Sequence, residues 1–349
     1  MSPTTSNVTL ALLLAGTAAL ALPPSGALAG GAPPAHQFIE FGVPGDANGT
    51  VAISVSNGVV AGYWGDSSNA YHGFVRAADG TITSFDPPGS VLTWVAGIKT
   101  INANGDVTGW YVDSNNDLEH GFVRTADGTI TVFDMPNSIS TRGYSINDKG
   151  EITGIWKDSN GRDHGYVRKA SGRIKSFDPD GSTFTVPSDV NNDGVITGYW
   201  VDSSQIQHGF LRAPDGTVTN FDVAGSTSTI GRCINRSGVI SGEYTDSNDT
   251  LHAFVRAADG TITSFDPPGS ISTYAVPIDN KGVIGGFFED SGRAYHGYVR
   301  RPNGTIKVFD PPGSVYTIPM GVDSSHADGG AVTGYFSDGG KLQGFVRTP

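Results

Sequence analysis

A short block of sequence, His-Gly-Phe-Val-Arg or a close variant, recurs along the chain and restricts its possible folds more than any other feature. Most successive copies are 44 residues apart. The copies begin at His72, His120, His164, His208, His252, His296 and Gln343. A repeat of this length indicates a solenoid, a propeller or another array of similar units rather than one irregular core.

Each unit divides into four short runs with β-strand character. In the fourth copy these runs are Ser188–Val190, Val195–Val201, His208–Ala213 and Thr217–Asp222. Turn-forming sequences such as Asn-Asp-Gly separate them. Four antiparallel strands in each unit are typical of one propeller blade. The seven copies therefore predict an all-β fold, a seven-bladed β-propeller of four-stranded antiparallel blades.

The two ends of the chain carry complementary parts of one unit. The last copy reaches Pro349 soon after its third run and lacks the Phe-Asp run that follows in the other six copies. A matching segment, Phe38–Phe41, stands near the amino terminus instead. We expect this N-terminal strand to complete the last blade (a Velcro closure), because the pairing leaves no exposed strand edge. The predicted propeller domain is 38–349.

The amino-acid composition favours β-strands and argues against some classes of binding partner. The chain contains 49 Gly and 20 Pro, and only 16% of its residues are charged, against about 25% in an average domain. This composition favours strands joined by tight turns. The net charge is −12. An excess of acidic residues argues against binding to nucleic acid or to an anionic membrane surface, since both require clustered Lys and Arg.

The amino-terminal segment is typical of an export signal. Residues 7–22 are apolar and uncharged, and Ala27-Leu28-Ala29 follows them. We predict a signal peptide at 1–29, a flexible leader at 30–37, and a secreted or periplasmic monomer without a membrane span after cleavage. The alternative is an uncleaved membrane anchor, which is disfavoured because the apolar run is shorter than the roughly 20 residues that span a bilayer.

The order of small motifs within one unit supports the same location. Around the fifth copy, Ile234-Asn235 is followed by two spaced glycines and then by His252-Ala253-Phe254. This pattern resembles the HAF-type repeat family of extracellular bacterial proteins. The resemblance covers all seven copies, although the last has Gln343 in place of His. It implies export and a repeated architecture, and it implies no particular reaction.

Several residues occur in every copy at the same place. A glycine stands in the middle of each second run, an aromatic residue follows two places later, and an Asp follows four places later. In six copies a His comes after that Asp. A metal site or sugar-binding aromatics would explain the pattern, but residues needed in every unit usually perform a local task. We predict that Asp caps the turn, that His bonds a neighbouring strand, and that the aromatic packs between blades.

One string resembles the first half of a calcium-binding loop. It begins at Asp189, continues through Asn191 and Asp193, and has glycine at the sixth position. The twelfth position is Trp200, where a calcium loop requires a bidentate Glu. The string therefore lacks the ligand that completes such a site.

Two further candidate residues lack the neighbours that chemistry would need. His326 lies between Asp323 and Asp328 and is an isolated candidate metal ligand. Cys233 is the only cysteine, so no intramolecular disulfide can form, and no base that would activate a thiol stands beside it. We predict no metal, no cofactor and no catalytic residue.

Residues that differ between copies are better candidates for ligand binding. The second unit carries insertions, and the residues leading into the first run of several units are aromatic or cationic. We expect these side chains at the mouth of a central channel, where they would suit an anionic or sugar-like ligand. The candidate residues are Trp94, Lys99, Arg142, Tyr144, Arg232, Tyr274 and Tyr316.

These features favour a binding or interaction module outside the cytoplasm, with a glycan or a protein as its ligand. One alternative is a propeller-type enzyme that acts on polysaccharide, either a lyase or a hydrolase. Another is a purely structural envelope protein. The chain has no Gly-x-Ser-x-Gly, His-Glu-x-x-His or P-loop motif, and a fold alone does not choose among the three.

Overall fold

The structure is a computed structural model that describes residues 37–323 and 330–348. The regular secondary structure of these residues consists entirely of β-strands, β1 to β28. This part of the chain contains no helix that is long and apolar enough to cross a membrane. The predicted signal peptide, all of the leader except residue 37, and His326 lie outside the described residues.

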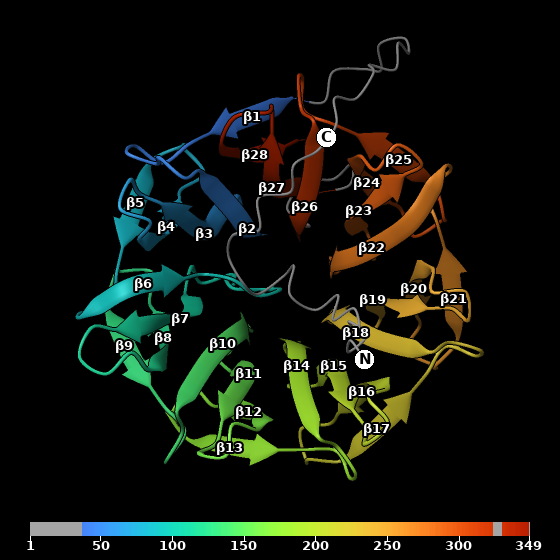
Figure 1. Cartoon of the computed structure of the whole chain (residues 1–349), viewed down its shortest axis with the longest axis horizontal. Helices are drawn as coiled ribbons and strands as arrows, with labels where there is room; N and C mark the ends of the chain where they lie inside the picture. The colour runs from blue at the N-terminus through green and yellow to red at the C-terminus, as the bar shows by residue number, and fades with distance from the viewer. Residues whose placement is uncertain (1–36, 324–329, 349) are drawn as a thin grey trace, which may run out of the picture.

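The strands pair in chain order into antiparallel groups of four. Strands β6 to β13 form one eight-stranded sheet, because a short parallel pairing between β8 and β10 joins two groups. The other described strands form five four-stranded sheets. Figure 1 shows the groups arranged around a common centre, with the first strand of each group nearest to it.

The bounds of the strands follow the repeat. The first strands are β2 (Thr50–Ser56), β6 (Ser90–Trp94), β10 (Ser140–Ile146), β14 (Phe184–Val190), β18 (Ser228–Ile234), β22 (Ser270–Ile278) and β26 (Tyr316–Asp323). The second strands are β3 (Val59–Gly65), β7 (Val107–Asp113), β11 (Ile152–Lys157), β15 (Ile196–Val201), β19 (Ile240–Thr245), β23 (Ile284–Asp290) and β27 (Ala331–Ser337).

The outer two strands of each group are shorter. The third strands are β4 (Tyr71–Arg76), β8 (Glu119–Arg124), β12 (Asp163–Arg168), β16 (Gln207–Arg212), β20 (Leu251–Arg256), β24 (Tyr295–Arg300) and β28 (Leu342–Arg347). The fourth strands are β5 (Ile82–Phe85), β9 (Ile130–Phe133), β13 (Ile174–Phe177), β17 (Val218–Phe221), β21 (Ile262–Phe265), β25 (Ile306–Phe309) and β1 (Phe38–Phe41).

The N-terminal strand β1 pairs with β28 near the other end of the chain. The pairing is antiparallel, with Phe38 opposite Arg347 and Phe41 opposite Gly344. Beyond the strand ends, the Thr348 backbone N–H donates a hydrogen bond of 3.0 Å to the carbonyl of residue 37. The predicted pairing of Phe38–Phe41 with the last copy is confirmed.

The repeated glycine of the second strands faces a β-bulge in the first strand. In β10 the register with β11 shifts between Gly143 and Ser145, so Tyr144 is the extra residue. The glycine opposite, Gly154, has no room for a side chain, since a Cβ there would lie 2.0 Å from the Arg142 carbonyl oxygen. A glycine in the middle of a strand is typical of such a close approach of another backbone.

The first strand of the fourth copy is longer than the sequence suggested. We predicted Ser188–Val190, but β14 begins at Phe184. The cause is Pro187, which interrupts the strand pattern in the sequence. In the structure Pro187 pairs with Gly198 directly beside the bulge at Ser188. The hydrogen-bond ladder is irregular at a bulge, and a proline is accommodated there.

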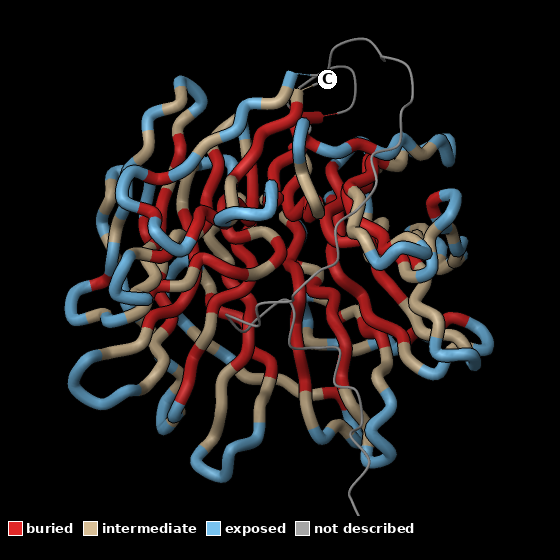
Figure 2. Tube along the Cα trace, turned by 45° about the horizontal axis from the view of Figure 1, so that its top comes forward, coloured by how far each residue is buried: buried red, intermediate tan, exposed pale blue. Residues whose placement is uncertain are grey.

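Buried residues lie along the strands, and exposed residues concentrate in the turns (Figure 2). The phenylalanines of the third strands, such as Phe74, Phe122 and Phe210, are fully buried. Each meets the edge of a ring from the preceding group, as Phe122 meets Phe85 at 5.9 Å between ring centroids. The repeated Phe positions therefore form the contacts between neighbouring sheets.

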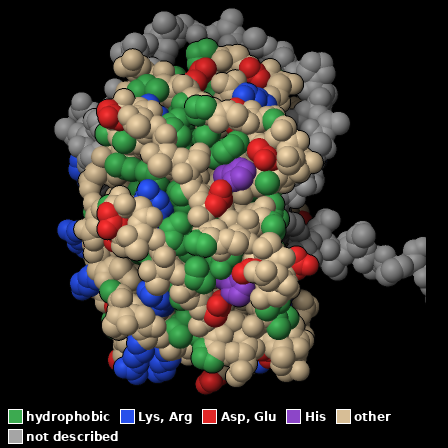
Figure 3. Space-filling model, turned by 90° about the vertical axis from the view of Figure 1, so that its left-hand side faces the viewer, with side chains coloured by type: hydrophobic (Ala, Val, Ile, Leu, Met, Phe, Trp, Pro, Cys, Tyr) green, Lys and Arg blue, Asp and Glu red, His purple; other side chains and the backbone are tan. Residues whose placement is uncertain are grey.

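The repeated histidines belong to the scaffold. His164 Nδ1 lies 2.6 Å from the carboxylate of Asp178, at the end of the adjacent fourth strand. The imidazole also stacks on Trp156, with 4.6 Å between ring centroids. The turn residue Asp158 accepts two backbone hydrogen bonds of 2.9 Å from its own turn. Histidines in Figure 3 lie beside acidic side chains in the same way. The structural interpretation of the repeated Asp, His and aromatic residues is confirmed.

Candidate functional site

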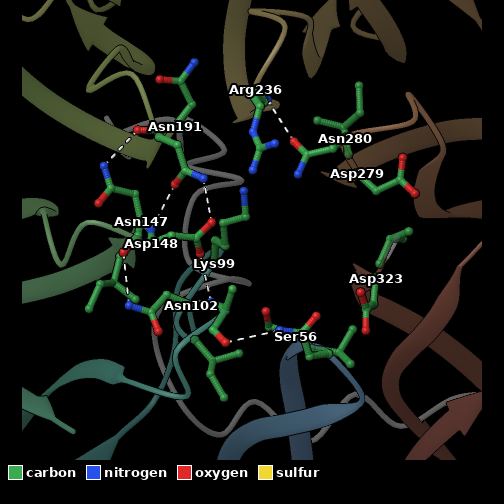
Figure 4. Close-up of a pocket in the computed structure, with 18 residues that line it drawn as sticks. Ser56, Lys99, Asn102, Asn147, Asp148, Asn191, Arg236, Asp279, Asn280 and Asp323 are labelled. Carbon is green, nitrogen blue, oxygen red and sulfur yellow. Dashed lines mark hydrogen bonds between the residues drawn. The ribbon is translucent and has the colours of Figure 1, made fainter. Parts of the chain in front are cut away.

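A cavity of about 290 Å³ lies at the centre of the molecule, on the side of the turns that join first to second strands. We call these turns the first turns. Figure 4 draws the 18 residues that line the cavity. They come from every group of strands, so the cavity lies where all the groups meet. Its wall is mainly amide and carboxylate side chains.

Asparagines just after the first strands form part of this wall, which includes Asn102, Asn147 and Asn191. The Asn147 carbonyl oxygen Oδ1 accepts hydrogen bonds from two backbone N–H groups of its own turn. Its Nδ2 donates to the main-chain carbonyl of Asn191 in the next group at 2.8 Å. The same donation joins Asn102 to Asn147, Asn191 to Asn235, and Asn235 to Asp279. We call Asn102, Asn147, Asn191 and Asn235 the asparagine ladder.

The carboxylates of the cavity wall also hold turns in place. Asp148 accepts a hydrogen bond of 2.8 Å from the Ala103 backbone N–H in the preceding group. Asp323 accepts one of 2.9 Å from the Gly58 backbone N–H. Asp279 accepts two of 2.8 Å from backbone N–H groups of its own turn. These three negative charges are therefore stabilised by the protein itself.

The cations of the cavity are in a different situation. Lys99 and Arg236 both line it, and their side chains extend toward one another in Figure 4. Among the described residues, neither has a carboxylate within 4.0 Å. Burial is the largest single effect on Lys99 and opposes its charge, but Asp189, Cys233 and Asp148 together outweigh it and raise the pKa of the ammonium. Lys99 is therefore protonated at neutral pH, beside a guanidinium that repels it.

Both cations break the repeat. Arg236 follows a ladder asparagine, and the residues at that place in neighbouring copies are Ala103, Asp148, Asn192 and Asn280. Sequence reasoning singled out Lys99 but missed Arg236, although the same comparison of copies would have found it. The cavity thus combines repeated amide side chains with two positive charges on one part of its wall.

Lys99 is the one predicted site residue that lines this cavity. Arg142 instead forms a bidentate pair with Glu119 on β8, with Nε 2.7 Å and an NH2 nitrogen 2.5 Å from the carboxylate oxygens. Its guanidinium also lies over the ring of Trp110, 5.4 Å from the centroid. The predicted Trp94 stacks on Tyr71 at 4.4 Å.

The remaining predicted residues lie on other first strands. Arg232 is buried in β18 and pairs with Glu243 through two guanidinium nitrogens. Tyr274 stacks on Phe287 with 4.4 Å between ring centroids. Arg232 and Glu243 are near enough to affect the pKa of the Tyr274 hydroxyl, which burial raises. The structure thus brings Arg232 and Tyr274 together around Glu243, a residue that sequence reasoning missed.

Tyr144 and Tyr316 complete the predicted set. Tyr144 is buried beside Trp110, with the two rings edge to face at 5.7 Å. Tyr316 packs against the apolar cluster that contains Ile318 and Met320. The structure therefore collects Trp94, Arg142 and Tyr144 around Trp110 and leaves Tyr316 in another part of the centre.

Asp189, the first residue of the segment that resembles a calcium-binding loop, has a structural role. Asp189 is fully buried and accepts hydrogen bonds from Ser145 Oγ at 2.6 Å, Cys233 Sγ at 3.1 Å and the Ile234 backbone N–H at 2.9 Å. These donors come from the groups on both sides. In residues 37–323 and 330–348, no three His, Cys, Asp or Glu side chains are placed to hold a metal ion.

Comparison with known proteins identifies the fold. No protein-family model and no curated protein sequence matches the chain. The β-propeller domain of the Trilobed protease from Pyrococcus furiosus is similar over 85% of this chain and 95% of that domain, with 10% identity and a TM-score of 0.58. Puromycin hydrolase is similar over 84% of this chain and 51% of its own length, with 13% identity and a TM-score of 0.57.

A fungal lectin from Aleuria aurantia, a six-bladed β-propeller, matches 75% of this chain and 93% of its own, with 14% identity and a TM-score of 0.45. This chain spans about half the length of puromycin hydrolase. Identities this low establish a shared architecture and no shared chemistry. The fold is that of a β-propeller.

Proposed function

We propose that this chain is an exported, seven-bladed β-propeller of HAF-type repeats that binds an acidic glycan in the cavity at the first turns. Each four-stranded group is one blade, and β1 closes the ring by completing the blade of β26–β28. The pairing of β1 with β28 supports the closure. The similarity to the Pyrococcus furiosus propeller, which has an open velcro topology, supports the propeller fold alone. The exported form begins after the signal peptide at 1–29 and acts as a monomer without a cofactor.

The observation that carries the ligand class is the pair of cations without carboxylate partners. Lys99 and Arg236 repel one another across the cavity, and an anionic group between them would replace that repulsion with two attractions. The volume of about 290 Å³ is at the small end of ligand pockets. It suits one acidic sugar residue better than a protein segment.

The test is a titration of the folded protein with uronic-acid oligosaccharides, followed by calorimetry. We expect Lys99→Gln and Arg236→Gln each to weaken binding at least tenfold, since each removes a charge-assisted interaction of about 1.5–3 kcal/mol. Binding should also weaken as salt is raised, because the attraction is electrostatic.

Two substitutions serve as matched controls. Lys175→Gln on β13 and Lys307→Gln on β25 remove the same charge from exposed positions on outer strands. They should leave the affinity within twofold of the wild-type value. Equal loss in the control variants would show that only the net charge matters. A wild-type protein that binds no acidic oligosaccharide would refute the proposed function.

A further inference from the structure

The residues at the bulges of the first strands differ in chemistry between two parts of the centre of the molecule. In β2, β22 and β26 the bulge residues Ile53, Val276 and Met320 are apolar and pack in one cluster. In β10 and β18 the same position holds Tyr144 and Arg232. The polar residues do not repeat, so the scaffold does not require them.

Four side chains form a buried polar centre on that side, which we call the inner cluster. It consists of Tyr144, Tyr199, Arg232 and Glu243, whose exposed fractions are 2%, 0%, 8% and 2%. Within the described residues, the Tyr144 hydroxyl, the Tyr199 hydroxyl and Glu243 Oε2 have no hydrogen-bond partner. Buried polar atoms without partners are rare in folded proteins and require an explanation.

The members of the inner cluster are close enough to influence one another. Burial raises the pKa of the Tyr199 hydroxyl, Arg232 lowers it, and Tyr144 and Glu243 raise it further. Burial opposes the charge on Arg232, but Glu243 outweighs this effect and raises the pKa of the guanidinium. The cluster therefore contains a neutral ion pair and two neutral hydroxyls.

This charge balance restricts what could occupy the cluster. A cation would meet the Arg232 guanidinium, and an anion would meet the Glu243 carboxylate. Glu243 Oε2 can only accept a hydrogen bond, whereas a tyrosine hydroxyl can donate or accept one. A neutral molecule with several hydroxyl groups satisfies both kinds of atom.

Aromatic rings connect the inner cluster to the surface. Tyr144 meets Trp110 at 5.7 Å between ring centroids, Trp110 stacks on Trp94 at 6.5 Å, and Trp94 stacks on Tyr71 at 4.4 Å. Trp94 and Tyr71 are half-buried, so this row of rings reaches solvent. Aromatic walls with a few placed polar atoms are typical of small-molecule sites.

We propose that the inner cluster is a second ligand site, which binds a neutral, hydroxyl-rich ring such as a hexose residue. Hydroxyl groups of the ring bond Glu243 Oε2 and the hydroxyls of Tyr144 and Tyr199. The site rests on the proposed glycan-binding function but uses none of the residues that hold the acidic group. Neutral and acidic sugars therefore bind through different side chains.

The test uses a panel of neutral methyl hexosides, with binding measured by saturation-transfer NMR and calorimetry. The decisive variant is Tyr199→Phe, which removes only a hydroxyl that has no partner among the described residues. Tyr144→Phe is a second variant, whose hydroxyl lies beside the Arg142 guanidinium. We expect at least tenfold weaker hexoside binding in both, with an unchanged or higher melting temperature. The matched control is Tyr335→Phe, since Tyr335 also follows the repeated glycine of a second strand but lies in another group.

The outcomes separate this inference from the proposed function. Loss of hexoside binding in Tyr199→Phe but not in Lys99→Gln supports the second site. Hexoside affinity that is the same in Tyr199→Phe, Tyr144→Phe and wild type would overturn it. Wild-type protein that binds uronic-acid oligosaccharides but no methyl hexoside would also overturn it and would leave the acidic site intact.

Discussion

A single asparagine side chain at each ladder position connects two turns. Asn147 Oδ1 accepts hydrogen bonds within its own turn, and Nδ2 donates to Asn191 in the next group. An Asp side chain at this position still accepts the hydrogen bonds of its own turn, but it has no N–H to donate to the next group. We expect Asn147→Asp to lower the free energy of unfolding by about 1–3 kcal/mol, because a buried carbonyl loses its donor and the new carboxylate faces Glu151, to which Nδ2 also donates at 2.9 Å. Urea denaturation at neutral pH measures this change.

The control for the ladder is an asparagine that has only the first task. Asn303 Oδ1 accepts a hydrogen bond from the Thr305 backbone N–H in an exposed turn. In other copies Asp79 and Asp259 fill the same role. Asn303→Asp should therefore change stability by less than about 0.5 kcal/mol. A similar loss in both variants would show that the bond to the neighbouring group contributes nothing.

The His296 side chain gives stability a pH dependence of known sign. Its hydrogen bond to Asp310 raises the pKa above the ordinary 6.5, despite the opposing effect of burial. A raised pKa in the folded state stabilises the fold at pH values below the ordinary pKa. This contribution disappears as the pH rises through the folded-state pKa.

We therefore expect the stability difference between wild type and His296→Gln to be larger at about pH 5.5 than at about pH 8.5. Gln occurs naturally at this place in the last copy, as Gln343, so the substitution should not disturb the strand. Urea denaturation at both pH values measures the difference. An equal difference at the two pH values contradicts the prediction.

At the residue scale, the sequence predicted roles for repeated side chains well and for unique ones poorly. A repeated Asp or His performs a task that its own turn or neighbouring strand defines, as Asp158 and His164 do. Arg142 and Arg232 looked available for a ligand, but each pairs with a carboxylate from a second or third strand. Those partners, Glu119 and Glu243, are distant from them in the repeat pattern, so the sequence did not reveal the pairs.

At the scale of elements, β1 is the strand whose removal tests the closure most directly. Proteins that begin at residue 37 and at Gly42 differ only by the segment that pairs with β28. Without β1, β28 keeps β27 but loses its outer partner, and the ring contacts of Phe38 with Phe309 and Phe345 disappear. We expect the shorter protein to melt at least about 10 °C lower, because four paired residues and the packing of two half-buried phenylalanines are lost.

Thermal denaturation followed by circular dichroism measures this difference. A change of less than a few degrees would mean that β1 contributes little to the fold, and the proposed closure of the ring would then fail. The protein that begins at residue 37 is the matched control, because both proteins lack the same preceding segment.

The strands themselves were predictable because each unit repeats the same local pattern. The glycine of the second strands indicated a close backbone approach, which the structure confirms at Gly154. The beginning of β14 was wrong because Pro187 is compatible with a strand only beside a bulge, and the sequence does not show the bulge directly. Strand boundaries thus depend on contacts with the neighbouring strand.

At the scale of the whole molecule, Cys233 can report global unfolding. It is buried, and burial raises the pKa of its thiol, so the reactive thiolate is scarce in the folded state. Its hydrogen-bond partners, Asp189 and the Ile278 carbonyl, belong to the groups on either side of its own. We expect a thiol reagent to label Cys233 only as fast as the protein unfolds, with a rate that rises with urea.

A cysteine in an exposed turn provides the comparison. Ser204 is exposed, so Ser204→Cys in a Cys233→Ser background should react at once in the folded protein. Rapid labelling of Cys233 without denaturant would show that the centre opens locally. The labelling rates are followed by absorbance or mass spectrometry.

The four-stranded groups and the pairing of β1 were predictable from the sequence, whereas the position of the central cavity was not. Periodicity predicted the four-stranded groups, and the incomplete last copy predicted the role of Phe38–Phe41. The expected ligand face was the one that leads into the first strands, but the cavity lies at the opposite turns. Which end of the centre remains open depends on the size and partners of side chains from every group, and no single copy contains that information.

The pairing of β1 with β28 also sets an order of events during synthesis. The first strand to leave the ribosome finds its partner only after the last strand has been made. Until then Phe38 and Phe41 have no sheet to join, and the intermediate groups can form hairpins but no complete circle. The sheet that contains β1 and β28 is therefore completed only at the end of synthesis.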